Sequence, residues 1–197
     1  MKVTKRKTAQ HRAALVRAAA RLFRGRGIDG VGVAEIGKAA GLTHGALYAQ
    51  FPSKGALAAE ALRQGLDRSI AYLTAPKHNH RPTLRDYLNR YLSRSLRDNL
   101  ADGCPMAASA SEIARQDALV SARFSEGFER TVDAVQAALG PSKSPASERR
   151  RARAIVAAMI GGVAVSRAVL KARPRLADDI LTAVREVVGE VGGATTR

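Results

Sequence analysis

The chain has 197 residues and a formal net charge of +16 at pH 7, with 33 Lys and Arg against 17 Asp and Glu. This length allows one long domain or two small ones around a buried core, and a positive surplus this large favours an anionic partner. The only cysteine, Cys104, excludes an internal disulfide framework and fits a reducing cytoplasm. Aromatic residues make up 4% of the chain and long stretches lack strand-like alternation, so we expect an all-α protein.

The positive charge is concentrated near the N-terminus. Residues 1–57 hold 11 Lys and Arg against two acids, whereas the other 140 residues hold 22 against 15. This distribution predicts a nucleic-acid-binding head over residues 1–57 and a second domain, the body, over residues 58–197. The longest uncharged apolar run, residues 154–166, is too short to span a bilayer, and no signal peptide is evident. We therefore expect a cytoplasmic protein with no membrane partner.

The predicted elements begin after a basic arm of residues 1–8. A first helix is predicted over residues 9–27, closed by Gly27 and Gly30. Its buried stripe has apolar residues at helical spacing: Leu15, Ala18, Ala19, Leu22 and Phe23. Its arginines are expected to face solvent: Arg12, Arg17, Arg21, Arg24 and Arg26.

Residues 33–54 predict two short helices joined by a glycine turn. The first has an apolar residue every three or four positions and is followed by Gly41, where a helix ending in a left-handed residue prefers glycine. Thr43 can cap the second helix, whose apolar residues are Leu47 and Phe51. This layout is typical of a helix-turn-helix, in which the second helix enters the DNA major groove. The sequence therefore predicts DNA recognition.

Loops rich in proline or glycine separate the remaining helices, which bring the expected total to about nine. Residues 74–82 hold two prolines and no apolar pattern, so they form a loop between a helix over residues 54–73 and one capped by Thr83. Pro105 suits the first turn of the helix that follows a break at residues 101–105.

The last two predicted helices are residues 147–172 and 175–188. Each has an apolar face, and at the end of a monomer these faces have no evident role other than contact with a second subunit. The adjacent glycines Gly161 and Gly162 allow two helices to approach closely. We therefore predict a dimer interface of two helices per subunit rather than a pocket wall. Seven residues are assigned to it: Ile155, Met159, Gly162, Val163, Leu176, Ile180 and Val184.

The first third of the chain contains an ordered set of short motifs: Leu22-Phe23, Gly27, Gly30, Glu35-Ile36, AAGL at 39–42, Gly45, Leu47-Tyr48 and FPSK at 51–54. In order and spacing this set resembles the TetR family of bacterial transcriptional repressors. The resemblance implies a three-helix DNA-binding head joined to a C-terminal ligand-binding and dimerisation domain. It also implies a homodimer that binds a palindromic operator in double-stranded DNA, has no cofactor and is released by a small-molecule inducer.

The resemblance assigns six residues to the DNA contact: Thr43, His44, Gly45, Tyr48, Gln50 and Lys54. The first three begin the recognition helix and would face base edges or phosphate. Tyr48 and Lys54 would hold backbone phosphate, with Gln50 nearby. The chain departs from the family at Gly32, where Thr or Ser is usual, and at Ala49 and Gln50, where an aromatic residue or histidine is common. These departures leave the base preference open.

Cys104 is expected at the N-cap of a helix, where the positive end of the helix favours a reactive thiolate. The Gly-Cys segment is similar to that of the family branch containing electrophile- and oxidant-sensing repressors of the N-ethylmaleimide-reductase type. That resemblance gives Lys171 as a partner for the cysteine, whereas the alternative is that Cys104 is a small buried filler. A ligand pocket, guessed from position, would have these walls: Tyr91, Cys104, Met106, Phe124, Phe128 and Met159.

The sequence leaves two alternatives to a DNA-binding repressor. The charge alone also fits a DNA-coating protein that is indifferent to sequence, whereas a repressor requires a specificity ratio of at least ~10³. An electrophile-processing enzyme would need Cys104 as nucleophile, yet no His, Asp or Glu is placed as its base. His78 and His80 lie in a loop without a nearby acid or cysteine, so no metal site is expected there.

Overall fold

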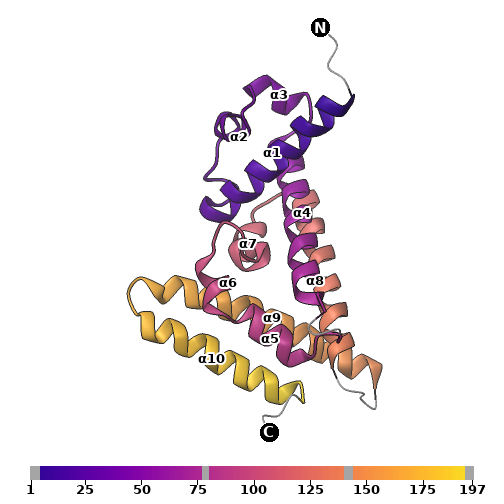
Figure 1. Ribbon diagram of the computed structural model, residues 1–197, viewed down its shortest axis with the longest axis vertical. Helices are drawn as coiled ribbons and strands as arrows, with labels where there is room; N and C mark the ends of the chain where they lie inside the picture. Colours follow the sequence, from indigo (N-terminus) through magenta and orange to yellow (C-terminus); the bar gives the residue numbers. More distant parts are fainter. Residues whose placement is uncertain (1–4, 77–79, 140–143, 194–197) are drawn as a thin grey trace.

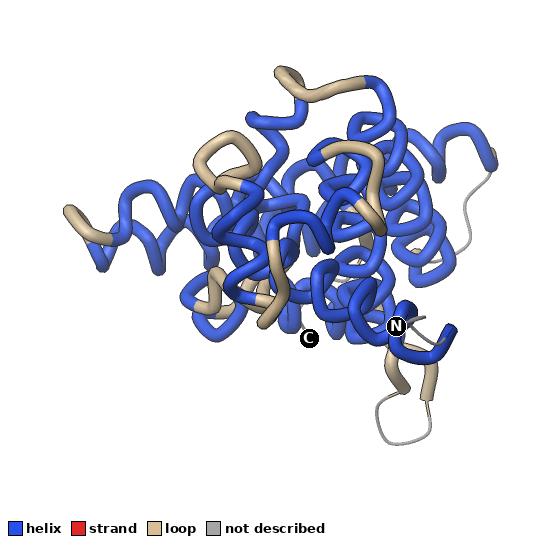
Figure 2. The backbone as a smooth tube through the Cα atoms, turned by 90° about the horizontal axis from the view of Figure 1, so that it is seen from above, coloured by secondary structure: helices blue, strands red, loops and turns tan. Residues whose placement is uncertain are grey.

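The computed structural model describes residues 5–76, 80–139 and 144–193, and in these ranges the chain forms ten helices and no strand (Figures 1 and 2). The all-α prediction is confirmed. One helix more is present than the nine expected, because Leu92 leaves helical geometry at φ −87°, ψ 49°. Ser93 then caps a separate single-turn helix, α6 (Arg94–Asp98), by accepting a hydrogen bond from the Leu96 amide.

The head consists of α1 (Lys5–Arg26), α2 (Val33–Ala39) and α3 (His44–Tyr48). α1 begins four residues earlier than predicted, so part of the expected arm is helical. It ends at Gly27, whose φ of +78° is a left-handed conformation that glycine adopts without strain. Fully buried apolar side chains from all three helices form one small core: Leu15, Ala19, Ile36 and Leu47.

α4 (Lys54–Thr74) begins in the head and runs down into the body, where it lies beside α8 (Ala118–Ala138) (Figure 1). Gly127 of α8 lies directly against Leu66 of α4, because a Cβ atom at position 127 would lie 2.4 Å from Cδ1 of the buried Leu66. One hydrophobic core runs through head and body without a break. The boundary between residues 57 and 58 stays a prediction, and α4 crosses it as one continuous helix.

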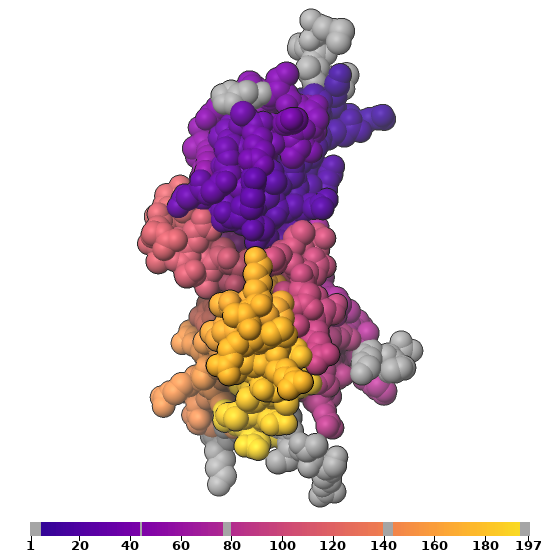
Figure 3. All heavy atoms as spheres, turned by 90° about the vertical axis from the view of Figure 1, so that its left-hand side faces the viewer, coloured from indigo at the N-terminus to yellow at the C-terminus, as the bar shows by residue number. Residues whose placement is uncertain are grey.

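The rest of the body contains α7 (Pro105–Ile113), directly beneath the head, and α5 (Leu84–Tyr91), α9 (Pro145–Leu170) and α10 (Pro174–Val191) farther from it (Figure 1). Three of these helices begin with proline, whose missing N–H would have no partner in the first turn anyway. Pro174 therefore opens α10, whereas the sequence pattern placed it before the helix. Figure 3 shows the head at one end of an elongated molecule and α9 and α10 toward the other.

α9 is the one described helix long and apolar enough to cross a membrane by length and composition. Core helices of soluble proteins pass the same test. The buried residues of α9, among them Ile155, Val156, Met159 and Val163, pack into the body core. In its most apolar stretch, however, only 39% of the residues are buried in the subunit. The helix therefore has a second apolar face that the subunit itself leaves uncovered.

Polar contacts join the head to α7 and to the loop before it. The expectation that Arg24 faces solvent is wrong, because the side chain is only 5% exposed beneath this loop. Its Nε donates to the Ala101 carbonyl oxygen at 2.6 Å. On the other side of the junction, the Asp29 amide donates to Glu112 Oε1 at 2.9 Å, and Gln116 Nε2 donates to the Asp29 carboxylate at 3.1 Å. These hydrogen bonds connect α7 and the loops on either side of it directly to the end of α1 and the residues that follow it.

Candidate nucleic-acid interface

The turn between α2 and α3 is fixed by two backbone hydrogen bonds around a left-handed glycine. Gly41 has φ +69°, its amide donates to the Lys38 carbonyl at 3.1 Å, and the Leu42 amide donates to the Gly37 carbonyl at 2.9 Å. This pair of bonds is the Schellman arrangement, which satisfies the free carbonyls at a helix end. The glycine turn predicted from Gly41 is confirmed, and it sets the angle at which α3 leaves α2.

The short helix α3 is attached to the head mainly through Leu47, which is fully buried. Thr43 is its N-cap residue as predicted, but its side chain makes no capping hydrogen bond and is exposed. Gly45 is exposed, and a Cβ atom at this position would meet nothing within 4 Å. The first turn of α3 therefore presents a hydroxyl and a bare stretch of backbone to the outside.

The other predicted contact residues lie close to this turn in the chain. Tyr48 is 50% exposed at the end of α3. Lys54 is the first residue of α4, whose N-cap Ser53 accepts a hydrogen bond from the Ala56 amide at 3.0 Å. Helix N-termini attract phosphate, and a lysine at this position adds a full positive charge. The side chain of His44 lies outside the described part of the structure.

Arg12 holds the end of α3, a role that the sequence pattern missed. Its Nη1 donates to the Gln50 carbonyl oxygen at 2.9 Å, and its guanidinium lies 4.1 Å from the centre of the Phe51 ring. Cation–π contacts of this kind are worth about 0.5–1 kcal/mol when exposed. The sequence carried no signal for this contact, because 38 positions separate Arg12 from Gln50. The half-buried Gln50 thus takes part in positioning α3 through its backbone.

The positive charge of the head is little offset by its own acids. Glu35 forms an ion pair with Arg26, and Asp29 is engaged at the junction with α7. Arg17, Arg21 and Lys38 are exposed. A positive surface around an exposed short helix attracts the phosphate backbone over long distances.

A fixed glycine turn, an exposed second helix and a positive three-helix head together define a helix-turn-helix DNA-binding protein. Residues 15–61 match the family model described as bacterial regulatory proteins, tetR family. No curated protein matches the chain significantly in sequence. The chain is thus similar to the TetR family of transcriptional regulators in its N-terminal DNA-binding region, residues 15–61.

Solved structures of similar fold cover nearly the whole chain. The reduced form of NemR from E. coli has a TM-score of 0.72 at 19% identity and covers 91% of this chain and 95% of its own. A TetR transcriptional regulator from Chloroflexus aurantiacus has a TM-score of 0.72 at 23% identity, with 94% and 97% covered. A TetR regulator from Legionella pneumophila has a TM-score of 0.73 at 16% identity, with 96% and 98% covered. At these identities the likeness concerns the fold.

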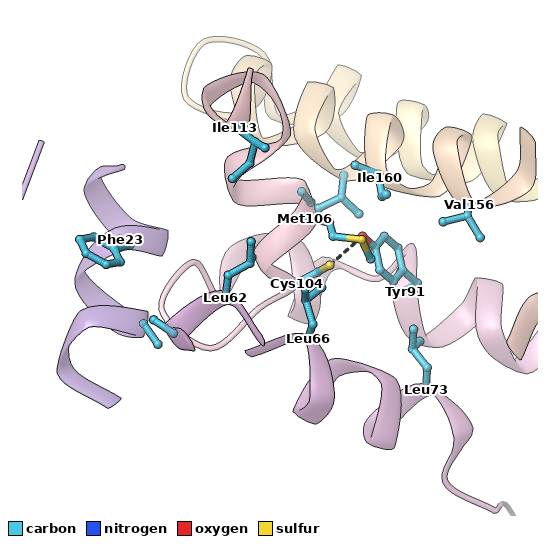
Figure 4. Close-up of a cluster of buried hydrophobic side chains, with 14 of the residues drawn as sticks. Phe23, Leu62, Leu66, Leu73, Tyr91, Cys104, Met106, Ile113, Val156 and Ile160 are labelled. Atoms are coloured by element: carbon cyan, nitrogen blue, oxygen red, sulfur yellow. Dashed lines mark hydrogen bonds between the residues drawn. The ribbon is translucent and has the colours of Figure 1, made fainter. Parts of the chain in front are cut away.

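Cys104 is the N-cap residue of α7, as predicted, but it is only 1% exposed. The hydroxyl of Tyr91 donates to its Sγ at 3.0 Å (Figure 4). Burial raises the pKa of Tyr91 well above its ordinary value, so this hydroxyl keeps its proton and acts as the donor. Lys171 is exposed after the end of α9. Arg167, one turn earlier, is instead the cation near Cys104. Its Nε and Nη2 donate to the carbonyl oxygens of Arg97 and Leu96 in α6, and its Nη2 would lie 2.7 Å from a Cβ atom at Gly103.

A cavity of about 500 Å³ lies between α1, α4, α6 and the loop before α7, and Cys104 forms part of its wall. Of the six residues guessed as pocket walls, Cys104 is the one that lines this cavity. Tyr91, Met106 and Met159 are buried in the body core, and Phe124 and Phe128 pack partly buried against it. Sequence position alone therefore placed Cys104 at the cavity but missed its other lining residues, which come from α4, from α6 and the loop after it, and, through Arg24, from the head.

The residues predicted to form a dimer interface divide between the inside and the edge of the subunit. Ile155, Met159 and Val163 are at most 1% exposed and belong to the subunit's own core. Gly162 also faces inward, where a Cβ atom would lie 3.2 Å from Val184 of α10. Leu176, Ile180 and Val184 are partly exposed. The outward face of α9 consists instead of small apolar residues: Ala154, Ala157, Gly161, Val165 and Ala168.

Among the described residues, no group of three or more His, Cys, Asp and Glu side chains is arranged to hold a metal ion. His80 lies in the loop before α5, and His78 lies outside the described residues.

Replacing Lys54 with alanine is expected to weaken binding to every DNA sequence and to flatten the salt dependence. Each phosphate contact contributes about one unit to the slope of log affinity against log salt. The measurement is a titration of labelled DNA at several salt concentrations. The control is Lys171→Ala, which removes the same charge from the body. An unchanged slope in the Lys54 variant contradicts the phosphate contact.

Proposed function

We propose that the chain is a homodimeric transcriptional repressor that binds a palindromic operator and leaves it when the body changes shape. The observation that carries this proposal is the exposed first turn of α3, held on a positive head by the Gly41 turn and the buried Leu47. The match of residues 15–61 to the tetR family model supports DNA binding as the basic activity. Two heads related by a twofold axis would match half-sites about 34–36 Å apart or a multiple of that distance.

Dimerisation is supported by the uncovered face of α9. Five small apolar residues follow one another at spacings of three and four, so they form a continuous stripe along the helix: Ala154, Ala157, Gly161, Val165 and Ala168. Val187 and Val191 add exposed apolar area on α10. Stripes of this kind on a soluble protein are typical of a protein interface, and small side chains permit close helix packing. A second copy of the chain is the occupant we infer.

α4 is the element that would transmit a change from body to head. It starts with Lys54 at the proposed DNA surface, and its later turns, at Gly65, Arg68, Ser69 and Tyr72, form a wall of the cavity. A ligand that binds one orientation of α4 more tightly shifts the population toward that dimer shape. A different separation of the two heads prevents both from docking at once, and operator affinity falls although no DNA contact has changed.

The experiment that tests the function is selection of bound sequences from random double-stranded DNA. A repressor of this kind enriches a palindrome and binds it at least ~10³-fold more tightly than unrelated DNA. Enrichment of no sequence would contradict the proposal and favour a DNA-coating protein. The family is one of regulatory proteins, and no His, Asp or Glu contacts the buried thiol of Cys104 as a base in the described structure, so we infer no enzymatic activity.

Modification of Cys104 is a second candidate trigger, because this residue is both the N-cap of α7 and part of the cavity wall. An adduct on Sγ would displace the Tyr91 hydroxyl and occupy the cavity. We expect oxidants or electrophiles to release the wild-type protein from its operator and to leave Cys104→Ser bound, as measured by fluorescence anisotropy. Equal release of both proteins would exclude the cysteine as the trigger.

A further inference from the structure

We infer that the cavity between head and body is a binding site for the anionic group of a small organic acid, and that Arg24 is the residue that holds it. The site contains two guanidinium groups, Arg24 from α1 and Arg68 from α4, against one carboxylate, Asp102. Its volume of about 500 Å³ is in the range of small-molecule sites. Anion binding itself does not depend on the function proposed above, whereas its effect on DNA does.

The guanidinium of Arg24 is incompletely satisfied by the protein. Its Nε donates to the Ala101 carbonyl, but its Nη2 is buried and has no hydrogen-bond partner. Asp102 Oδ1 lies 3.7 Å from Nη2, and the Asp102 side chain is 58% exposed. A buried N–H without an acceptor is destabilising, and more so when the group is charged. An oxyanion in the cavity would supply the missing acceptor.

Arg68 gives this site a net positive charge. Burial, and then repulsion by Arg68, lower the pKa of Arg24 to about 10, and Asp102 opposes this only in part. Arg24 is still protonated at neutral pH, so two positive groups line the same cavity. Arg68 is exposed and forms no hydrogen bond or ion pair with the described residues. Its charge is therefore available to a ligand.

The remaining walls suit the polar and apolar parts of an organic acid. The Asp102 amide donates a hydrogen bond to Asn99 Oδ1 at 3.0 Å, so the NH₂ group of the Asn99 side chain is left to donate to a ligand. Ser69 and Ser95 add hydroxyl groups, and Tyr72 and Leu96 supply apolar surface. A carboxylate or phosphate ester with a small apolar body matches this combination.

Arg24 connects this site to both the head and the body. Arg24 stands on α1 of the head, it contacts the loop that leads to Cys104, and its Nη1 would lie 3.1 Å from a Cβ atom at Gly65 of α4. A glycine at position 65 thus makes room for the guanidinium between the two helices. A ligand that binds Arg24 and Arg68 together joins α1 to α4 and so favours one orientation of the head over others.

Isothermal titration calorimetry of the full-length protein tests the site, with benzoate, its uncharged isostere benzamide and inorganic phosphate as probes at constant ionic strength. We expect saturable binding of benzoate or phosphate, and at least about tenfold weaker binding of benzamide, because hydrogen bonds to a charged acceptor are stronger than those to a neutral one. Binding of phosphate without benzoate would assign the site to phosphate esters, and the reverse to carboxylates. Binding of neither, or of benzamide as tightly as benzoate, would overturn the inference.

Two variants and a matched control locate the binding. Arg24→Gln and Arg68→Gln are each expected to weaken anion binding at least about tenfold, and Arg150→Gln, which removes an exposed charge from α9, should leave it unchanged. If Arg24→Gln does not fold, Arg68→Gln decides, because Arg68 makes no hydrogen bond or ion pair within the described ranges of the chain. Equal binding by all variants would overturn the inference. Absence of anion binding in a protein that still selects an operator would refute this site alone, whereas anion binding without operator selection would refute the proposed function alone.

Discussion

Replacing Leu47 with alanine is expected to abolish operator binding although this side chain does not face the DNA. Leu47 is fully buried and is the main anchor of α3 on the head core. Truncation of a buried leucine lowers the free energy of unfolding by about 2–5 kcal/mol, through lost burial and through the cavity that remains. A five-residue helix is not stable by itself, so α3 would lose its orientation before the whole protein unfolds.

Urea unfolding and DNA titration of the same samples separate the two effects of this substitution. Leu119→Ala is the matched control, because Leu119 is 46% exposed on α8 and its truncation is expected to change the free energy of unfolding by no more than about 0.5 kcal/mol. We expect Leu47→Ala to lower both stability and operator affinity and Leu119→Ala to lower neither. Full operator binding by Leu47→Ala would show that α3 is held by other contacts.

Introducing glutamate at both Val165 and Val187 is expected to convert the proposed dimer to monomers. These residues are 51% and 58% exposed on α9 and α10, so the isolated subunit tolerates charge there. In an interface, each carboxylate would be buried without a partner, which costs far more than the burial of valine gained. Two linked heads bind two half-sites with an avidity advantage of roughly 10²–10⁴-fold, and this advantage is lost when the subunits separate.

Sedimentation velocity gives the oligomeric state, and titrations with a full palindrome and a single half-site give the two affinities. We expect the double variant to lose affinity for the palindrome and to keep its affinity for the half-site, which also shows that each subunit is folded. Leu119→Glu adds charge to an exposed apolar position outside α9 and α10 and should remain dimeric. A double variant that still sediments as a dimer would place the interface elsewhere.

Local signals in the sequence were sufficient for the helix-turn-helix. The left-handed Gly41, the N-cap position of Thr43 and the burial of Leu47 depend on residues within a few positions of one another. Backbone geometry and helical periodicity act over this range, so a pattern of residue types predicts them. The same holds for Pro105 at the start of α7 and for the all-α class.

Contacts between distant segments were decided by the tertiary structure. Arg12 and Arg24 look alike in sequence, as arginines on the polar face of one helix, yet Arg12 holds the end of α3 and Arg24 lies buried against a loop 77 positions away. Likewise, Gly161 and Gly162 are neighbours, but α9 turns one outward and the other against Val184. Periodicity specifies which residues share a face of a helix, whereas the packing of the whole chain decides what covers that face. The sequence by itself therefore determined that this is a helix-turn-helix DNA-binding protein. The tertiary structure decided which residues line the cavity, which form the exposed apolar stripe of α9 and which join head to body.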